Sequence, residues 1–298
     1  VILLSFGIIN VLTAYNNRLR EYKTLSLFQV IRSAFQNIIP VIWGYINPNV
    51  LGLLLPYTFG QILGVNYQFD PLKKHAQEII KVKWKSLYKV AKIHYRQPLL
   101  SSPALFVNTF SYTSITIFVE LLFDMSIVGF YSISTRLLGL PLNLVSGNVL
   151  RVFFEEASRE FYQTGDYFKA FTKTVKFLIF IAIPMTVTLM IIPSKFYGLF
   201  FGEEWIIAGQ YIQILAPMFG IRFIVSPLTA GFQISKRQKS ELFFQILLLI
   251  TSVLPFIITK VFLLPVTSFL MLITISKSIV YVFFFFILLK FSRNLRTK

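Results

Sequence analysis

Five charged side chains lie beyond the first turn of long apolar runs in this 298-residue chain: Arg32, Arg136, Arg222, Lys277 and Glu120. A charge at such a position is costly unless it faces a water-filled cavity or a partner. At a helical rise of about 1.5 Å per residue, Arg32 and Arg222 lie roughly 12 Å from the basic end of their runs. Arg136 and Lys277 lie nearer the middle of theirs. Because guanidinium groups pair with phosphate oxygens and a low-dielectric wall strengthens the attraction, we expect the four cations to line a cavity that attracts a phosphate-bearing ligand.

Simpler roles for these side chains stay open at this stage. Arg32 and Arg222 could snorkel to the aqueous boundary, and Glu120, near the end of its run, could reach water or pair with Arg136. Three asparagines within the runs could bind hydroxyl groups of a ligand, although hydrogen bonds between helices are their commoner role: Asn37, Asn108 and Asn143. The chain has no cysteine, and neither of its two histidines has a partner at motif spacing, so we expect no metal site and no catalytic residues.

The elements that must position these residues are transmembrane helices. Hydrophobic residues make up 55% of the chain, and its mean hydropathy of +0.69 is higher than one soluble domain of this length would show. Nine apolar runs, most of about 20 residues, are long enough to cross the hydrocarbon core as helices: 1–15, 25–46, 50–67, 99–122, 126–150, 173–193, 206–231, 240–259 and 263–289. We therefore predict an all-α integral membrane protein with nine visible transmembrane helices.

Basic residues mark one end of these helices. Most of the 29 lysines and arginines fall in segments that the alternation of helices places on one side: 16–24, 68–98, 151–176, 236–239 and 290–298. Short loops rich in these residues stay cytoplasmic, so we expect these segments and the C-terminus on the cytoplasmic side. The net charge of +17 does not indicate nucleic-acid binding, because the charges are dispersed at helix ends and no binding motif accompanies them; anionic membrane lipids explain them better.

Two segments outside the apolar runs have amphipathic patterns. Between Asp70 and Arg96, apolar residues are interspersed with lysines, as in a helix that lies on the cytoplasmic leaflet; a partner-binding arm is the alternative. A second surface helix is expected over 155–168. Segment 68–98 is therefore the expected linker between the parts of the chain on either side of it.

The basic elbows at 16–24 and 236–239 belong to a longer internal match. Ile8–Gln29 and Ile224–Gln245 are identical at seven of 22 aligned positions, 216 residues apart, although shared apolar composition alone raises chance matches. If the match is a duplication, its repeating unit holds six helices, and an even number makes the two units parallel repeats. The whole protein would then have twelve helices in two parallel six-helix bundles.

The repeat divides the chain into three parts. We expect 1–67 to hold the last three helices of the N-terminal bundle, 68–98 to form the amphipathic cytoplasmic linker, and 99–298 to form the C-terminal six-helix bundle. The chain begins at Val1 inside an apolar run, with neither an initiator methionine nor a signal peptide. We therefore expect an N-terminally truncated sequence that lacks three upstream helices.

Several short motifs follow one another in an order that is typical of one transporter family. They are Asn17-Arg18, Val128-Gly129-Phe130-Tyr131 with Thr135-Arg136-Leu137-Leu138 and Pro141, Phe201-Gly202-Glu203-Glu204-Trp205, Ser226-Pro227-Leu228 and Lys236-Arg237-Gln238. With these motifs the chain resembles the polysaccharide flippases of the MOP exporter superfamily, the Wzx-type exporters of O-antigen, lipopolysaccharide and capsule precursors. None of the motifs is a catalytic signature, and the missing N-terminal helices are the main departure from the family.

The resemblance implies a flippase that moves a polyprenyl-pyrophosphate-linked oligosaccharide across the bacterial cytoplasmic membrane by alternating access, for surface polysaccharide biosynthesis. Its partners would be this lipid-linked oligosaccharide, membrane lipids and a polysaccharide polymerase complex. No cofactor is implied, and coupling to Na⁺ or H⁺ stays open. The pyrophosphate is then the expected ligand of the four buried cations.

Three other functions compete with this interpretation. A membrane glycosyltransferase or polymerase needs a carboxylate as base or metal ligand, yet Glu120 is the only acid beyond the first turn of a run. No phosphate-binding loop of the GxxxxGK type is present, so we do not expect ATP to be the direct energy source. A cation-coupled multidrug exporter of the MATE type, with the same fold, is the main alternative, but cationic drugs call for intramembrane carboxylates. A scaffold of a polysaccharide-synthesis complex needs no charge at depth. We therefore expect a transporter and not an enzyme.

Overall fold

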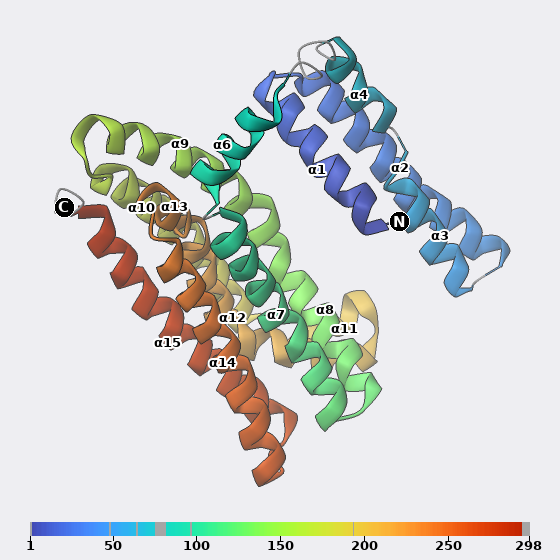
Figure 1. Cartoon of the computed structure of the whole chain (residues 1–298). Coiled ribbons are helices and arrows are strands. Elements are labelled where there is room, and N and C mark those ends of the chain that lie inside the picture. Colours follow the sequence, from blue (N-terminus) through green and yellow to red (C-terminus); the bar gives the residue numbers. More distant parts are fainter. Residues whose placement is uncertain are drawn as a thin grey trace. The chain divides into compact units, whose positions relative to one another are not determined.

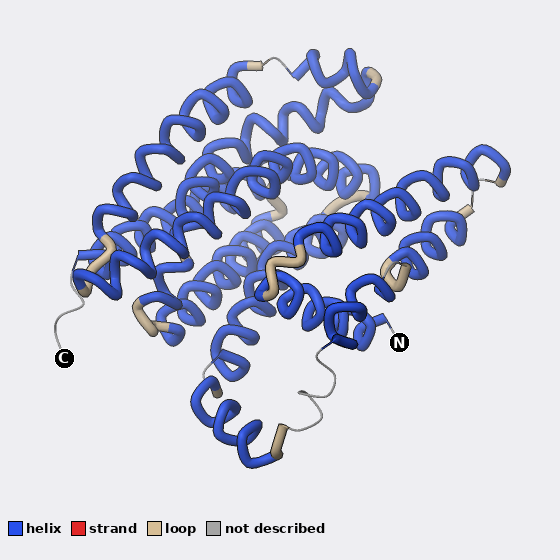
Figure 2. The backbone as a smooth tube through the Cα atoms, turned by 90° about the horizontal axis from the view of Figure 1, so that it is seen from above, coloured by secondary structure: helices blue, strands red, loops and turns tan. Residues whose placement is uncertain are grey.

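The computed structural model describes residues 2–47, 49–63, 65–74, 82–95, 97–192 and 194–293. Every regular element in these ranges is a helix, so the expected all-α class is confirmed for them (Figure 2). Eight helical segments of this part are long and apolar enough to cross a membrane: Tyr22–Ile46, Val50–Lys73, Pro98–Leu122, Met125–Thr164, Phe168–Ile191, Glu203–Ile234, Gln238–Phe262 and Val266–Arg293. By the length and composition of its helices, the chain is a multi-pass membrane protein.

The helices form two compact units, Val1–Ile93 and His94–Lys298, which are described separately below. Unit 1 contains the helices coloured blue to teal in Figure 1: α1 (Ile2–Arg18), α2 (Tyr22–Ile46), α3 (Val50–Gly60), α4 (Val65–Lys74) and most of α6 (Trp84–His94). The first expected span corresponds to α1, which has only 17 residues. Because α1 is not among the eight segments that are long and apolar enough to cross a membrane, the totals of nine and twelve helices stay predictions.

Unit 1 has a small core. Ile9, Leu12, Phe28 and Val65 form its buried cluster. The Asn16 side chain donates a hydrogen bond of 3.0 Å to the carbonyl oxygen of Gln68 and so ties α1 to α4. At the other end of the unit, the side chain of Asn49 accepts a bond of 2.9 Å from the backbone N–H of Gly52 and caps α3.

The expected amphipathic linker falls partly outside the described residues, which omit 75–81 and Arg96. Its described parts are α4 and α6, and both are helical as expected. On α6, Trp84 and Tyr88 are 86% and 71% exposed beside several lysines. Large exposed aromatics next to cations suit the membrane interface, so the interfacial location stays the preferred prediction for α6.

Unit 2 contains the other helices, coloured green to red in Figure 1: η1 (Gln97–Ser101), α7 (Ser102–Leu122), α8 (Met125–Pro141), η2 (Leu142–Ser146), α9 (Gly147–Thr164), α10 (Phe168–Ile191), α11 (Ser194–Phe201), η3 (Glu203–Trp205), α12 (Ile206–Leu228), α13 (Ala230–Ile234), α14 (Gln238–Phe262) and α15 (Val266–Arg293). The second surface helix expected over 155–168 corresponds largely to the end of α9, which continues the line of α8 through η2 and reaches Thr164.

Helix α12 lies at the centre of unit 2 and packs against α8, α10, α11 and α15. Its buried positions go round the whole helix, which is typical of a helix enclosed by others. Small residues allow the close approach of α12 and α10, because a Cβ atom on Gly220 would clash with Thr186 Oγ1 of α10. Helix α7 packs mainly against α14, which in turn packs against α15.

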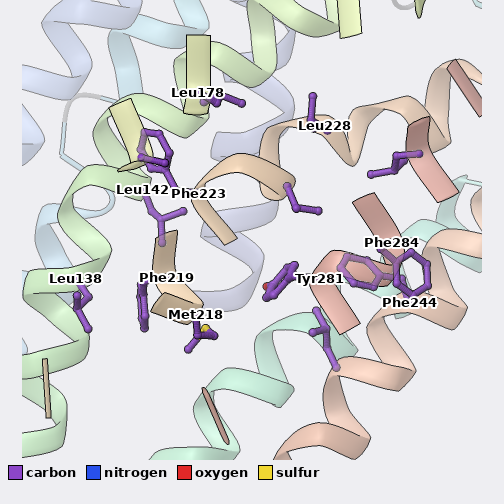
Figure 3. Close-up of a cluster of buried hydrophobic side chains, with 14 of the residues drawn as sticks. Leu138, Leu142, Leu178, Met218, Phe219, Phe223, Leu228, Phe244, Tyr281 and Phe284 are labelled. Atoms are coloured by element: carbon purple, nitrogen blue, oxygen red, sulfur yellow. The ribbon is translucent and has the colours of Figure 1, made fainter. Parts of the chain in front are cut away.

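Aromatic side chains fill the core of unit 2 between α13, α14 and α15. Figure 3 shows Tyr281 beside Phe244 and Phe284, and the ring centroids of the two phenylalanines are 4.0 Å apart. Phe232 of α13 packs edge-on against Phe284 at 6.2 Å. These contacts hold α14 and α15 in a fixed rotation relative to each other, and that rotation decides which polar side chains of the two helices meet.

The two elbows of the internal match share one backbone geometry. Arg20 and Lys236, 216 residues apart, both adopt left-handed φ angles, of 61° and 56°. In each elbow the N–H of this residue donates to the carbonyl three residues back, at 3.1 Å in both copies. The next N–H donates to the carbonyl five residues back, at 3.0 Å in the first copy and 2.7 Å in the second. The pattern is that of a Schellman-type helix end.

The helices around the elbows also correspond. Both ends of α2 and of α14 lie at positions 216 residues apart, and the starts of α3 and α15, at Val50 and Val266, have the same offset. Apolar composition alone does not produce matching helix ends, so the local structure supports the duplication. The arrangement of the repeats as two parallel six-helix bundles stays a prediction.

Candidate functional site

Lys277 is a charged residue in the core of unit 2, with none of its surface exposed. It lies on α15, and the buried positions of this helix recur every three or four residues: Phe269, Leu270, Ile273, Thr274, Lys277, Tyr281, Phe284, Leu288 and Ser292. The helical period therefore places the lysine on the inward face, where aliphatic and aromatic side chains are the rule.

Neutral groups surround the Lys277 ammonium. Its Nζ donates to Ser111 Oγ of α7 at 2.9 Å and to the Leu248 carbonyl oxygen of α14 at 3.1 Å. Ser111 and Ser252 link the same two helices, because the Ser252 hydroxyl donates to the Ser111 carbonyl oxygen at 2.8 Å. Within the described ranges, the side-chain ion pairs are those of Lys73 with Asp70 and Lys173 with Glu156. The buried ammonium thus has hydrogen-bond acceptors there but no carboxylate.

The ring of Tyr112 brings Lys277 and Arg222 together. Nζ of Lys277 lies 4.5 Å from the centre of this ring, and the guanidinium carbon of Arg222 lies 3.8 Å from it. Both distances are in the range of cation–π attraction. The Tyr112 hydroxyl is hydrogen-bonded to the hydroxyl of Tyr281 on α15. Helices α7, α12 and α15 each contribute to this cluster, and two cations share one aromatic side chain.

A cavity of about 360 Å³ opens beside this cluster. Its lining comes from four elements: Tyr112, Thr113, Ile115 and Thr116 of α7; Tyr131, Thr135 and Gly139 of α8; Leu142 and Asn143 of η2; and Met218, Phe219 and Arg222 of α12. The α8 positions are four residues apart and so share one face of that helix. The lining contains one cation, hydroxyl groups and an amide but no acid, so the cavity can hold an anion with hydroxyl-bearing parts.

The structure brings only some of the predicted site residues together. Arg222 and Lys277 contact the same Tyr112 ring, and Asn143 lies in the wall of the cavity that Arg222 also lines. Arg136 is exposed on α8 and does not line this cavity; one residue after Thr135, it is turned by about 100° around the helix. Arg32 belongs to unit 1, where its guanidinium carbon lies 5.9 Å from the Phe6 ring centre.

The remaining predicted residues make mostly structural contacts. The Asn108 amide donates to Gln245 Oε1 of α14 at 2.7 Å, a bond between helices. Asn37 donates to the Ser33 carbonyl oxygen within its own helix at 2.7 Å. Glu120 is exposed near the end of α7 and makes no ion pair with Arg136 in the described structure. Their expected roles in a cavity stay predictions.

Sequence reasoning missed Tyr112, Tyr281, Ser111 and Ser252, although a signal was present. Asn108 and Ser111 of α7 are three residues apart, and Gln245 and Ser252 of α14 are seven apart, so each pair lies on one face of its helix. Matching polar faces on two helices predict that these helices pack against each other.

One comparison with known proteins gives a match. The family model described as "Polysaccharide biosynthesis protein" covers residues 1–210, more than two thirds of the chain. The chain belongs to this family. Membership in a family of polysaccharide biosynthesis proteins agrees with the broader part of the expected resemblance and does not favour the multidrug-exporter alternative. No curated protein and no solved structure matches the chain significantly.

The family match covers only part of the candidate site. Tyr112 and the α8 wall of the cavity fall within residues 1–210, whereas Arg222 and Lys277 lie beyond them. Both cations of the cluster are therefore assigned to the site from their contacts and burial alone.

Proposed function

We propose that this polysaccharide biosynthesis protein is a Wzx-type flippase that moves a polyprenyl-pyrophosphate-linked oligosaccharide across the bacterial cytoplasmic membrane. The observation that carries the proposal is Arg222, a guanidinium in the wall of a hydroxyl-lined cavity without an acid in that wall. A positive site without its own counterion favours an anionic ligand over a cationic drug. Family membership supplies the link to polysaccharide precursors.

The geometry of Arg222 suits the capture of a phosphate. The guanidinium carbon of Arg222 lies over the Tyr112 ring, whereas the N–H donors of a guanidinium lie in its plane and point outward from its edge. The arginine can therefore keep its aromatic contact while the edge binds two phosphate oxygens. Thr113, Thr116 and Asn143 in the cavity wall offer hydrogen bonds to sugar hydroxyls.

Lys277 adds positive potential behind Arg222 without reaching the cavity wall. Two cations around one ring repel each other, and a bound dianion between the arginine and the aqueous side relieves that repulsion. Binding of the pyrophosphate and its release then change the balance of charge in the cluster. In this proposal, that change is coupled to the exchange between inward- and outward-open states.

The finer architecture belongs to the same proposal. The protein would have twelve helices in two parallel bundles, with segment 68–98 as the cytoplasmic linker, 99–298 as the C-terminal bundle and a cytoplasmic C-terminus. The duplicated elbows support this plan, since both copies end a helix in the same way. Such repeats are typical of carriers that work by alternating access.

Complementation tests the proposal. A flippase-deficient bacterial strain would carry the gene as wild type, Arg222→Ala, Arg222→Lys or Lys260→Ala. Lys260 is the matched control, because it is an exposed cation near the far end of α14. We expect Arg222→Ala to abolish surface polysaccharide and Arg222→Lys to restore only part of it, because lysine keeps the charge but lacks the two-pronged donor. Full surface polysaccharide in Arg222→Ala, at wild-type abundance in the membrane, would refute the role of the cavity.

A further inference from the structure

A second cavity lies at the end of unit 2 where two membrane spans begin. It has a volume of about 520 Å³ and combines Lys236, Arg237 and Lys239 with Leu99 and Leu100. The leucines belong to the first turns of the span Pro98–Leu122, and the basic residues precede or open the span Gln238–Phe262. The cavity therefore lies at the ends of two membrane spans, and its lining combines cations with aliphatic side chains.

The cations of this cavity have no acidic partner in the described structure. Lys236 and Lys239 are exposed, and neither takes part in an ion pair there. The guanidinium carbon of Arg237 lies 4.2 Å from the centre of the Phe291 ring, and the residue is exposed. The nearest acid along the chain is Glu241, whose carboxylate accepts a bond of 3.5 Å from Ser101 and lines a different cavity. The positive charge is thus left for a ligand.

The turn that carries these cations has a strained backbone conformation at Lys236. Lys236 adopts a φ of 56°, a left-handed conformation that glycine reaches freely and that costs an L-residue about 1 kcal/mol. Two backbone bonds fix the turn, from the N–H of Lys236 at 3.1 Å and from the N–H of Arg237 at 2.7 Å. Lys236 therefore lines the cavity from a turn whose backbone is fixed by hydrogen bonds, at a position that glycine would adopt without strain.

The equivalent elbow of unit 1 gives an internal comparison. It has the same turn geometry, but Glu21 stands where the second elbow has Arg237. Its adjacent cavity, of about 190 Å³, is lined by Glu21 and Asp70 as well as Lys23. Both elbows can fix the membrane topology through their basic residues. Of the two cavities, the one at the second elbow is larger, and the charged residues in its lining are all cations. A role in topology does not explain why the two linings differ in charge.

We propose that the cavity at Lys236 and Lys239 binds the phosphate group of an anionic membrane lipid, with Leu99 and Leu100 against the apolar part of that lipid. Two sources share this chemistry. One is a bulk phospholipid such as phosphatidylglycerol or cardiolipin, and the other is a polyprenyl diphosphate lipid. The inference does not depend on the proposed transport function, because it concerns a separate cavity and a property that can be measured by binding.

Binding to the purified full-length chain tests the proposal. The protein in neutral detergent would be titrated with cardiolipin, phosphatidylglycerol, polyprenyl diphosphate, phosphatidylcholine and inorganic phosphate, and bound lipid would be counted by native mass spectrometry. We expect the double variant Lys236→Gln/Lys239→Gln to bind the anionic lipids on the order of 10-fold more weakly. Tighter binding of cardiolipin than of polyprenyl diphosphate would assign the site to bulk lipid, and the reverse order would assign it to the diphosphate lipid.

Two controls distinguish this cavity from general surface charge. Lys23→Gln changes the equivalent position of the first elbow, and Lys290→Gln removes an exposed cation from the last turn of α15. Neither should alter lipid affinity by more than about 2-fold, since each removes a charge from outside the cavity. A loss in either control as large as in the double variant would overturn the proposal, and so would wild-type affinity in the double variant. Inorganic phosphate that binds as well as the lipids would also overturn it.

Lys236→Gly separates loss of binding from loss of folding. It removes the charge and relieves the left-handed strain, so the lipid-free protein should melt at the same or a higher temperature than the wild type. The same variant should gain less thermal stability from added anionic lipid. Arg20→Gly is its matched control in the first elbow and should retain the full gain. If Lys236→Gly retains the full gain as well, the cavity is not the lipid site.

Discussion

The Lys277→Met variant is expected to be at least as stable as the wild type and to transport poorly. Methionine preserves the length and the apolar stem of the side chain and removes only the ammonium group. That group is fully buried and, in the described structure, has Ser111 and the Leu248 carbonyl oxygen as its acceptors. Ser111 Oγ already lies 2.7 Å from the same Leu248 oxygen, so the change leaves no polar partner unsatisfied.

The expected magnitude follows from these contacts. Two hydrogen bonds from a charged donor contribute about 1.5–3 kcal/mol each, whereas burying an ammonium without a carboxylate costs several kcal/mol. The two effects nearly cancel, with a net gain for methionine on the order of 1 kcal/mol. Lys277→Ala differs, because it opens a cavity in the core and costs about 2–5 kcal/mol. The pair of variants therefore separates the charge from the volume of the side chain.

The assay combines two measurements on the same variants. Thermal unfolding in detergent, followed by tryptophan fluorescence, reports stability, and complementation of a flippase-deficient strain reports transport. An increase of about 1 kcal/mol corresponds to roughly 2–4 °C in melting temperature for a chain of this size. Lys260→Met is the control for the substitution itself, since Lys260 is exposed. A fall of more than about 4 °C in Lys277→Met would refute the reasoning, because the contacts of the ammonium would then outweigh its desolvation.

Three further predictions concern the packing around the site. Tyr112→Phe keeps the ring that contacts both cations and should retain most transport, whereas Tyr112→Leu should lower it as far as Arg222→Ala does in the same complementation assay. Gly220→Ala adds a Cβ atom that would clash with Thr186 Oγ1 and should destabilise the protein by about 1–3 kcal/mol, with at least half of the lost melting temperature recovered when Thr186→Ala is added. Asn108→Leu leaves the buried Gln245 amide without its 2.7 Å partner and should lower the free energy of unfolding by an amount on the order of 1 kcal/mol. Adding Gln245→Leu should recover that loss. Strictly additive losses of stability in the double-mutant cycle would contradict the prediction, because they would show that the two residues act independently.

The membrane helices could be predicted from the sequence because burial in lipid imposes a simple rule. A span needs about 20 apolar residues, and this chain has long runs of them. The sequence showed that the two elbows are similar but not which backbone conformation they adopt, since no glycine marks Arg20 or Lys236 as left-handed. The hydrogen bonds of the flanking helix ends impose that conformation.

The candidate site was only half predictable, for a reason of geometry. Counting along a helix gives the depth of a residue but not the direction that its side chain faces. Arg136 and Thr135 lie at the same depth, yet Thr135 lines the cavity and Arg136 is exposed. The direction depends on how α8 is rotated against α12, and that rotation is set by packing between helices distant in sequence.

The polar partners of Lys277 were hidden for another reason. Serine and tyrosine are common within membrane helices, because a hydroxyl can bond to its own helix at little cost. Ser111 therefore gives no signal by itself, whereas a lysine at mid-span does. Only the packing of α7 against α14 and α15 turns ordinary hydroxyls into ligands of a buried ammonium.

The repeat shows that the two halves share their turns but not their charges. The position equivalent to Lys277, 216 residues earlier, is Gln61, which is 1% exposed and has no hydrogen-bond partner for its amide among the described residues. The position equivalent to Arg222 is Phe6. A buried polar group thus recurs at one site of the duplicated fold, whereas the pair of cations occurs only in the second copy. An anion that binds to this pair interacts with one half more strongly than with the equivalent positions of the other. In the transport cycle proposed above, the two repeats would therefore contribute unequally, with Arg222 of α12 in contact with the anion and Lys277 of α15 adding positive potential behind it.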